Sequence, residues 1–108
     1  MIIETRRKYA MEIEFQDKTL ALLLTERAAE SRLPISVIKS FRNKYSVIQS
    51  APDQRTLRNW KSLHFEKLKG SMEGQYSIRL NDQWRLVFSL SEDCGYSKVL
   101  MLGIEDYH

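Results

Sequence analysis

The strongest constraint on the fold comes from residues 75–88, which read QYSIRLNDQWRLVF. Apolar side chains recur at every second position in both halves of this segment, and the turn-forming pair at residues 81–82 separates the halves. This pattern predicts two half-buried strands joined as a hairpin, because successive side chains of a strand point to opposite faces. Arg79 and Arg85 both fall on polar positions, so a hairpin in register would bring the two guanidinium groups to one surface.

Three elements are expected ahead of the hairpin. Residues 11–15 alternate apolar and acidic side chains, which predicts a strand with one buried face. Asp17 can cap a helix over residues 18–31, and Ser36 can cap a second helix that ends before Pro52. We expect these two helices to lie antiparallel, joined by a short loop.

The remaining segments complete an α+β pattern. Residues 53–68 show no single period and predict a turn of helix followed by an extended lead-in to the hairpin. Residues 99–104 alternate two apolar sets, which predicts an internal strand that carries residues 105–108 to its end. We therefore expect one domain over residues 1–108, a small antiparallel sheet with two N-terminal helices packed on it.

Charge and composition narrow the partners and the compartment. Residues 55–88 contain seven basic and three acidic side chains, in a chain of net charge +3. This local excess of positive charge weakly favours binding to a polyanion, and the alternative is an ordinary solvated surface. The N-terminus does not follow the order of a secretory signal, and no apolar run approaches the length of a bilayer. The single Cys94 cannot form an internal disulfide. We expect a soluble cytoplasmic protein that does not bind membranes.

Two functions compete for the arginines of the hairpin. Arg79 and Arg85 together could clamp a phosphate, since guanidinium donors match phosphate oxygens. The alternative is cross-strand ion pairing with Glu66, Glu73 or Asp82. Taken by themselves, the residues favour the two interpretations about equally.

The histidines supply the candidate acid-base groups. His64 and His108 are the only two in the chain, and imidazole is the usual proton carrier near neutral pH. Asp106 and Tyr107 stand within two residues of His108 and could orient an imidazole or contact a base. The alternative is an inert surface histidine and a frayed chain end. A metal site is not expected, because two histidines and scattered acids lack paired ligand spacing.

Three segments together carry a family resemblance. Residues 66–70 (EKLKG), the hairpin at 75–88 and the terminal residues 106–108 (DYH) resemble, in order and spacing, the HigB host-inhibition (plasmid-maintenance killer) toxins of the RelE/ParE superfamily. The N-terminal half fits by its pattern of one strand and two helices. The resemblance implies a ribosome-dependent mRNA endonuclease of a type II toxin-antitoxin system. Such a toxin cleaves the message in the ribosomal A site without a metal or cofactor, with the RNA 2′-hydroxyl as nucleophile.

The resemblance also implies roles for individual residues. The terminal triplet would transfer protons, while Lys67, Arg79 and Arg85 would stabilise the charge that develops on phosphorus. The order of His64 and His108 as acid and base stays open. The matching active-site positions are His64, Lys67, Arg85, Asp106, Tyr107 and His108, and the expected RNA-binding residues are Lys69, Arg79, Arg55, Arg58 and Lys61.

The implied partners are the ribosome, mRNA and a cognate antitoxin. In this family the antitoxin is usually a HigA-like helix-turn-helix protein, so the toxin would reach operator DNA only through the antitoxin complex. Two other functions fit the same fold, a ParE-like inhibitor of DNA gyrase and a non-catalytic RNA-binding module. Neither requires the acid-base groups of the terminal triplet, which therefore favours the nuclease.

Overall fold

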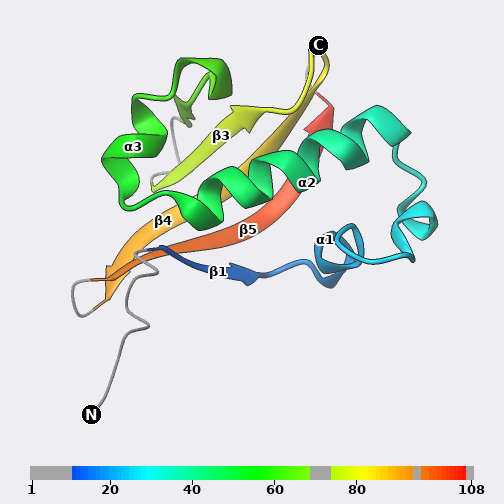
Figure 1. Cartoon of the computed structure of the whole chain (residues 1–108), viewed down its shortest axis with the longest axis horizontal. Coiled ribbons are helices and arrows are strands. Elements are labelled where there is room, and N and C mark those ends of the chain that lie inside the picture. Colours follow the sequence, from blue (N-terminus) through cyan, green and yellow to red (C-terminus); the bar gives the residue numbers. More distant parts are fainter. Residues whose placement is uncertain (1–10, 69–73, 94–95, 107–108) are drawn as a thin grey trace.

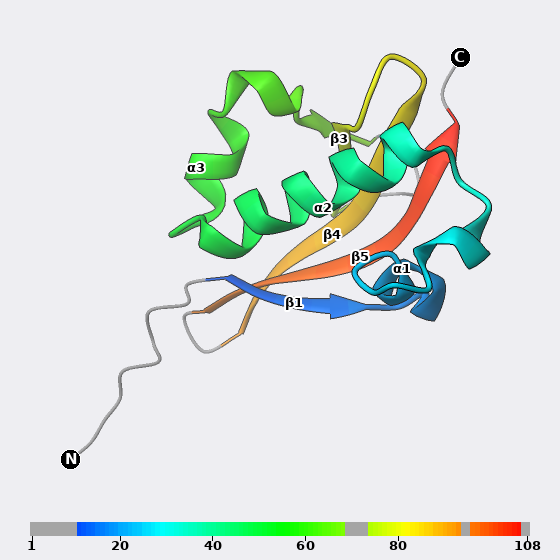
Figure 2. The same cartoon turned by 45° about the vertical axis from the view of Figure 1, so that its right-hand side comes forward.

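The fold is a single sheet with helices on one face (Figures 1 and 2). The computed structural model describes residues 11–68, 74–93 and 96–106. The helical elements are α1 (Lys18–Leu22), the 3-10 turn η2 (Ala28–Ser31), α2 (Ile35–Ser50), α3 (Gln54–Arg58) and the 3-10 turn η3 (Lys61–Leu63). The strands are β1 (Met11–Phe15), β2 (Glu66–Lys67), β3 (Gln75–Arg79), β4 (Trp84–Asp93) and β5 (Tyr96–Asp106).

The sheet confirms the predicted α+β class and adds one parallel pair. Its strand order is β1-β5-β4-β3-β2, and the neighbours from β2 to β5 are antiparallel. At the edge, β1 pairs parallel with β5, from which the helices and the three other strands separate it along the chain. The last strand is internal, as the apolar run at residues 99–104 predicted.

The hairpin has the register on which the shared arginine face depends. Arg79 pairs directly with Arg85, and Ile78 pairs with Leu86. Directly paired residues project from the same face of a sheet. The two arginines therefore share one face, and the buried pair Ile78 and Leu86 belongs to the other.

A β-bulge shifts the alternation of β5 against β4. Phe88 pairs with Met101, but Val87 pairs with Gly103, so Leu102 is an extra residue without a partner. The simple alternation expected across residues 99–104 is therefore wrong beyond Leu102. As a result, Glu105 rather than Ile104 stands opposite the arginine of β4.

The core lies between the sheet and α2, which crosses one face of it (Figure 1). Helix α2 contributes an apolar stripe at helical spacing, and the sheet contributes the face of Leu86 and Phe88. The buried residues that α2 and the strands contribute to this core are Met11, Val37, Ile38, Phe41, Ile48, Ile78, Leu86, Phe88, Val99 and Met101.

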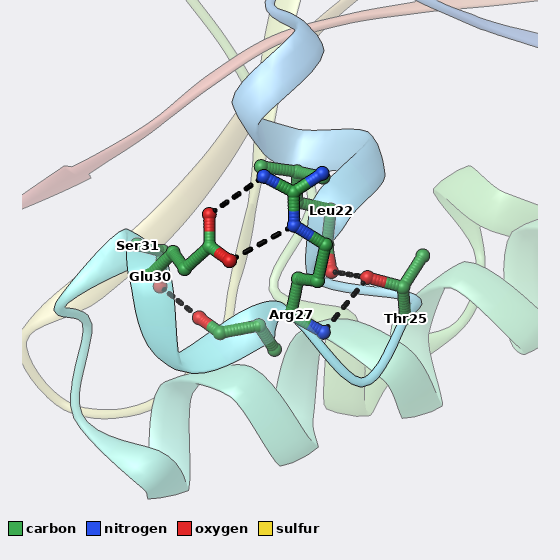
Figure 3. Close-up of polar contacts among 6 residues, drawn as sticks. Leu22, Thr25, Arg27, Glu30 and Ser31 are labelled. Carbon is green, nitrogen blue, oxygen red and sulfur yellow. Dashed lines mark hydrogen bonds and ion pairs between the residues drawn. The ribbon is translucent and has the colours of Figure 1, made fainter.

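The first predicted helix, over residues 18–31, is broken (Figure 3). Asp17 caps α1 as expected, but the helix ends at Leu22, where the Thr25 hydroxyl donates to the Leu22 carbonyl at 2.7 Å. The Arg27 backbone N–H then donates to the Thr25 hydroxyl at 3.0 Å. Threonine thus competes with the helical backbone for its own hydrogen bonds. The chain resumes as η2, next to which Arg27 donates twice to Glu30 at 2.9 Å.

The other helical predictions differ only at their starts. Helix α2 begins at Ile35 after Pro34, without a side-chain cap, so the expected cap at Ser36 is wrong. Proline fits the start of a helix because its fixed φ is preorganised and its missing N–H costs nothing there. The expected turn of helix after Pro52 is α3. Its cap, Asp53, accepts from the Thr56 backbone and hydroxyl, which lowers the pKa of Asp53.

Two isoleucines of α2 offer a matched test of this packing. Ile48 is 0% exposed in the core, whereas Ile35 is 71% exposed. We expect Ile48→Ala to lower the free energy of unfolding by about 2–5 kcal/mol, since it leaves a cavity. Ile35→Ala should change it by less than about 0.5 kcal/mol. Urea unfolding followed by circular dichroism measures both, and equal effects would contradict the described core.

Candidate active site

A row of charged residues, the arginine row, crosses three strands on the face of the sheet that points away from α2, which we call the arginine face. Arg79 of β3 pairs with Arg85 of β4, and Arg85 pairs in turn with Glu105 of β5. Val87 lies on the same face and is buried, although it does not belong to the main core cluster. Within the row, Arg85 is buried, Arg79 is half-buried and Glu105 is exposed.

Arg85 is buried and held by β2, β3 and the turn before β2. Only 6% of it is exposed. Its Nε donates to the Ser77 hydroxyl at 2.9 Å, and the same guanidinium donates to the His64 carbonyl and lies 3.8 Å from the Glu66 carboxylate. The side chain thus reaches across β3 and links the centre of the sheet to the segment that carries His64.

The pairing of Arg79 with Arg85 favours a bound anion. Like charges at directly opposed positions of a sheet are destabilising. Glu66 and Glu105 supply negative charge beside this pair, and a phosphate between the two guanidinium groups would reduce their repulsion further. Arg79 is half-buried, so part of it remains accessible to such a ligand. The structure therefore agrees with both interpretations of the arginines, because Arg85 lies beside Glu66 and the pair of arginines is also suited to binding phosphate.

His64 has an unusual backbone conformation. It follows η3 with φ 49° and ψ 55°, in the left-handed region, and its backbone N–H donates to the Lys61 carbonyl at 3.1 Å. A non-glycine residue in this region costs about 1–2 kcal/mol. Its side chain is exposed. A strained histidine beside a buried arginine is a feature expected of a functional site.

By the register, the two other predicted catalytic residues that the structure describes belong to the face that packs against α2, Lys67 on the edge strand β2 and Asp106 at the end of β5. Lys67 is exposed on β2 and pairs with Tyr76, one position away from Glu66 on the arginine face. Asp106 ends β5 opposite Trp84, and its carboxylate accepts from the Gln83 amide at 3.1 Å. The predicted site residues Tyr107, His108 and Lys69 lie outside the described residues.

The basic residues of α3 and η3 are separate from the arginine row. Arg58 lies over the rings of Phe65 and Tyr76, 5.3 Å and 5.0 Å from their centroids, and donates to the Tyr76 hydroxyl at 3.4 Å. Tyr76 belongs to the face that packs against α2, since it pairs with the buried Phe88. Arg55 and Lys61, also on these elements, are exposed. The structure therefore places Arg58 on the other side of the sheet from Arg85.

Sequence reasoning missed two residues of this face. Ser77 is fully buried, and its hydroxyl accepts a hydrogen bond from Arg85. The sequence indicated only that Ser77, two residues before Arg79, would point to the same face of the strand. Glu105 reaches the row through the bulge at Leu102, which no pattern in the sequence indicated.

Two negative findings apply to the described part of the chain. Within residues 11–68, 74–93 and 96–106, no three His, Cys, Asp or Glu side chains group closely enough to hold a metal ion. Over the same ranges, none of the helices has both the length and the apolar character to cross a bilayer.

The backbone of His64 can be tested by substitution. We expect His64→Gly to be more stable than His64→Ala by about 1 kcal/mol, because glycine adopts the left-handed region without a steric cost. At Lys67, whose φ is negative, the order should reverse by about 0.5–1 kcal/mol. Thermal and urea unfolding of the four variants measure both differences. A His64→Ala variant more stable than His64→Gly would contradict the strained turn.

Comparison with solved structures supports the fold alone. A YoeB/ParE toxin from Agrobacterium tumefaciens superposes with a TM-score of 0.58 at 14% identity, covering 91% of this chain and 100% of that one. At this identity the likeness supports the shared architecture and carries no statement about chemistry.

Comparison with sequences is more specific. "Toxin HigB-1" of Vibrio cholerae is 32% identical over 78 residues, which cover 72% of this chain and 82% of the relative. "Endoribonuclease HigB" of Proteus vulgaris is 30% identical over 94 residues, 87% and 96% of the two chains. Residues 13–105 match the model of the family described as RelE-like toxin of type II toxin-antitoxin system HigB. The chain belongs to the HigB family of RelE-like toxins.

Proposed function

We propose that this chain is the toxin of a type II toxin-antitoxin system and an endoribonuclease that cleaves mRNA on the ribosome. The observation that carries the proposal is the arginine face, where Arg79 and the buried Arg85 meet beside the strained His64. Guanidinium groups fixed before the substrate arrives stabilise a developing charge without further reorganisation. The relative from Proteus vulgaris, named as an endoribonuclease, supports this class of reaction.

The proposed reaction is an internal transesterification of RNA. The 2′-oxygen forms a bond to the adjacent phosphorus, and the bond from phosphorus to the 5′-oxygen breaks. One group accepts the 2′-hydroxyl proton, and another donates a proton to the leaving 5′-oxygen. The products are a 2′,3′-cyclic phosphate and a 5′-hydroxyl, so the atoms balance without an oxidant, a reductant or a metal.

The chain offers groups for each of these roles. Lys67, Arg79 and Arg85 stabilise the charge on the phosphate oxygens. The proton transfers belong to His64 and to residues of the terminal triplet, Asp106, Tyr107 and His108. These assignments rest on residue chemistry and on the family to which the chain belongs.

The ribosome completes the site by aligning the message. An internal nucleophile held in line with its phosphate can gain about 7 kcal/mol or more from positioning. The exposed basic residues Arg55 and Lys61 lie away from the arginine row and are suited to contacts with RNA backbones. We assign Lys69 and Arg58 to the same task. This division explains how a chain of 108 residues could select its substrate.

A cognate antitoxin is the expected protein partner. The family is defined by type II systems, in which a toxin is paired with a protein antitoxin. We propose a HigA-like helix-turn-helix antitoxin, with contact to operator DNA only through the complex. A cytoplasmic location follows from this pairing and from a ribosomal target.

Primer extension on a translated message tests the activity. With purified protein and translating ribosomes, we expect new 5′ ends within codons, each carrying the 5′-hydroxyl that the proposed reaction leaves on the downstream fragment. The same message without ribosomes should remain intact. An intact message on ribosomes, together with protein-linked DNA breaks in a parallel gyrase assay, would overturn the nuclease in favour of a ParE-like inhibitor. Binding without cleavage in both assays would favour a non-catalytic RNA-binding module.

The terminal histidine gives a second test. We expect deletion of His108 to abolish growth inhibition, because it removes one of two imidazoles available for proton transfer. Antitoxin affinity, measured by calorimetry, should stay within about threefold of the full chain, a change of less than 0.7 kcal/mol. His108→Gln controls for the length of the chain. Full toxicity of the deletion variant would remove His108 from the mechanism.

A further inference from the structure

We propose that Ser77 is a positioning residue of this active site, acting through Arg85 on the backbone of His64. The proposal rests on the nuclease function above and adds to it a residue that contacts no substrate. Its basis is an unbroken chain of hydrogen bonds from Ser77 through Arg85 to His64.

Ser77 is buried where an apolar side chain would cost less. It is 0% exposed, in the middle of β3, and pairs with Glu66 on one side and Val87 on the other. A buried hydroxyl is retained at low cost only when it is hydrogen-bonded. Its Oγ accepts from the Arg85 Nε at 2.9 Å, and its backbone carbonyl accepts from the Arg85 Nη2 at 3.4 Å. Both acceptors of one residue thus hold one guanidinium.

Those contacts determine where the rest of the guanidinium points. The group is planar and its donors keep a fixed fork geometry. With Nε fixed on the Ser77 hydroxyl, Nη2 is directed towards the segment before β2, where it donates to the His64 carbonyl. Without the hydroxyl, the long arginine side chain could pivot and leave that carbonyl.

The His64 carbonyl is a sensitive point of attachment. His64 joins η3 to the two-residue β2, and its left-handed backbone is held by its N–H bond to Lys61 and by its carbonyl bond to Arg85. Loss of the second bond would let the imidazole shift relative to the arginines. Catalytic groups tolerate only about 0.5 Å of displacement, and about 1 Å can cost a hundredfold in rate. Ser77 is therefore expected to act on the chemical step more than on RNA binding.

Single-turnover cleavage on programmed ribosomes tests this expectation. We expect Ser77→Ala to lower the maximal rate at least about tenfold while the half-saturating protein concentration changes less than about twofold. Ser89→Ala makes the same change on the same face of the sheet and should keep the rate of the wild type. Ser77→Thr, which keeps the hydroxyl, should recover most of the rate. A Ser77→Ala variant as fast as the wild type, or a folded Ser77→Thr variant as slow as Ser77→Ala, would overturn the proposal.

Hydrogen-deuterium exchange tests the positioning without relying on activity. In Ser77→Ala, peptides covering residues 61–67 should exchange faster than in the wild type, while peptides covering α2 should not change. Equal exchange in residues 61–67 overturns the role of Ser77 even if cleavage falls. If the wild type cleaves no message while exchange changes as expected, the proposed function fails and the positioning contact stands.

Discussion

The register of β3, β4 and β5 is the constraint on which the rest of the site depends. Side chains alternate between the two faces of a strand, so a slip of the hairpin by one residue would move both arginines into the core and Ile78 onto the charged face. The packing of Phe88 and Leu86 against α2 opposes such a slip. The same hydrophobic burial that stabilises the fold therefore determines which charges meet on the opposite face.

Arg85 converts that register into a site. A guanidinium that is 6% exposed would be unfavourable alone, but the Ser77 hydroxyl, the His64 carbonyl and the Glu66 carboxylate compensate for the lost water. These contacts join three separate segments, β4, β3 and the turn before β2. A guanidinium held in this way is suited to catalysis, because it need not reorganise when charge develops on the substrate.

The sequence predicted what depends on local alternation. The hairpin, the internal last strand and the shared face of Arg79 and Arg85 follow from a period of two that burial enforces. The first helix is shorter than the sequence predicted, because apolar spacing does not show that the Thr25 hydroxyl competes for backbone hydrogen bonds. Sequence reasoning missed the pairing of Glu105 with Arg85, because the bulge at Leu102 depends on how two strands fit together. The left-handed turn at His64 was missed for a similar reason, since its carbonyl bond comes from a distant strand.

The central proposal is that the two arginines of the arginine face, Arg79 and Arg85, stabilise the phosphate at which RNA is cleaved. The most direct measurement compares the maximal single-turnover rate of Arg79→Ala with that of Arg58→Ala on programmed ribosomes. Both variants remove one guanidinium, but Arg79 lies opposite Arg85 while Arg58 lies over Phe65 and Tyr76. We predict that the maximal rate falls about tenfold or more in Arg79→Ala and less than about threefold in Arg58→Ala, whose effect should fall on binding. A larger loss of maximal rate for Arg58→Ala than for Arg79→Ala would contradict the role of the arginine face.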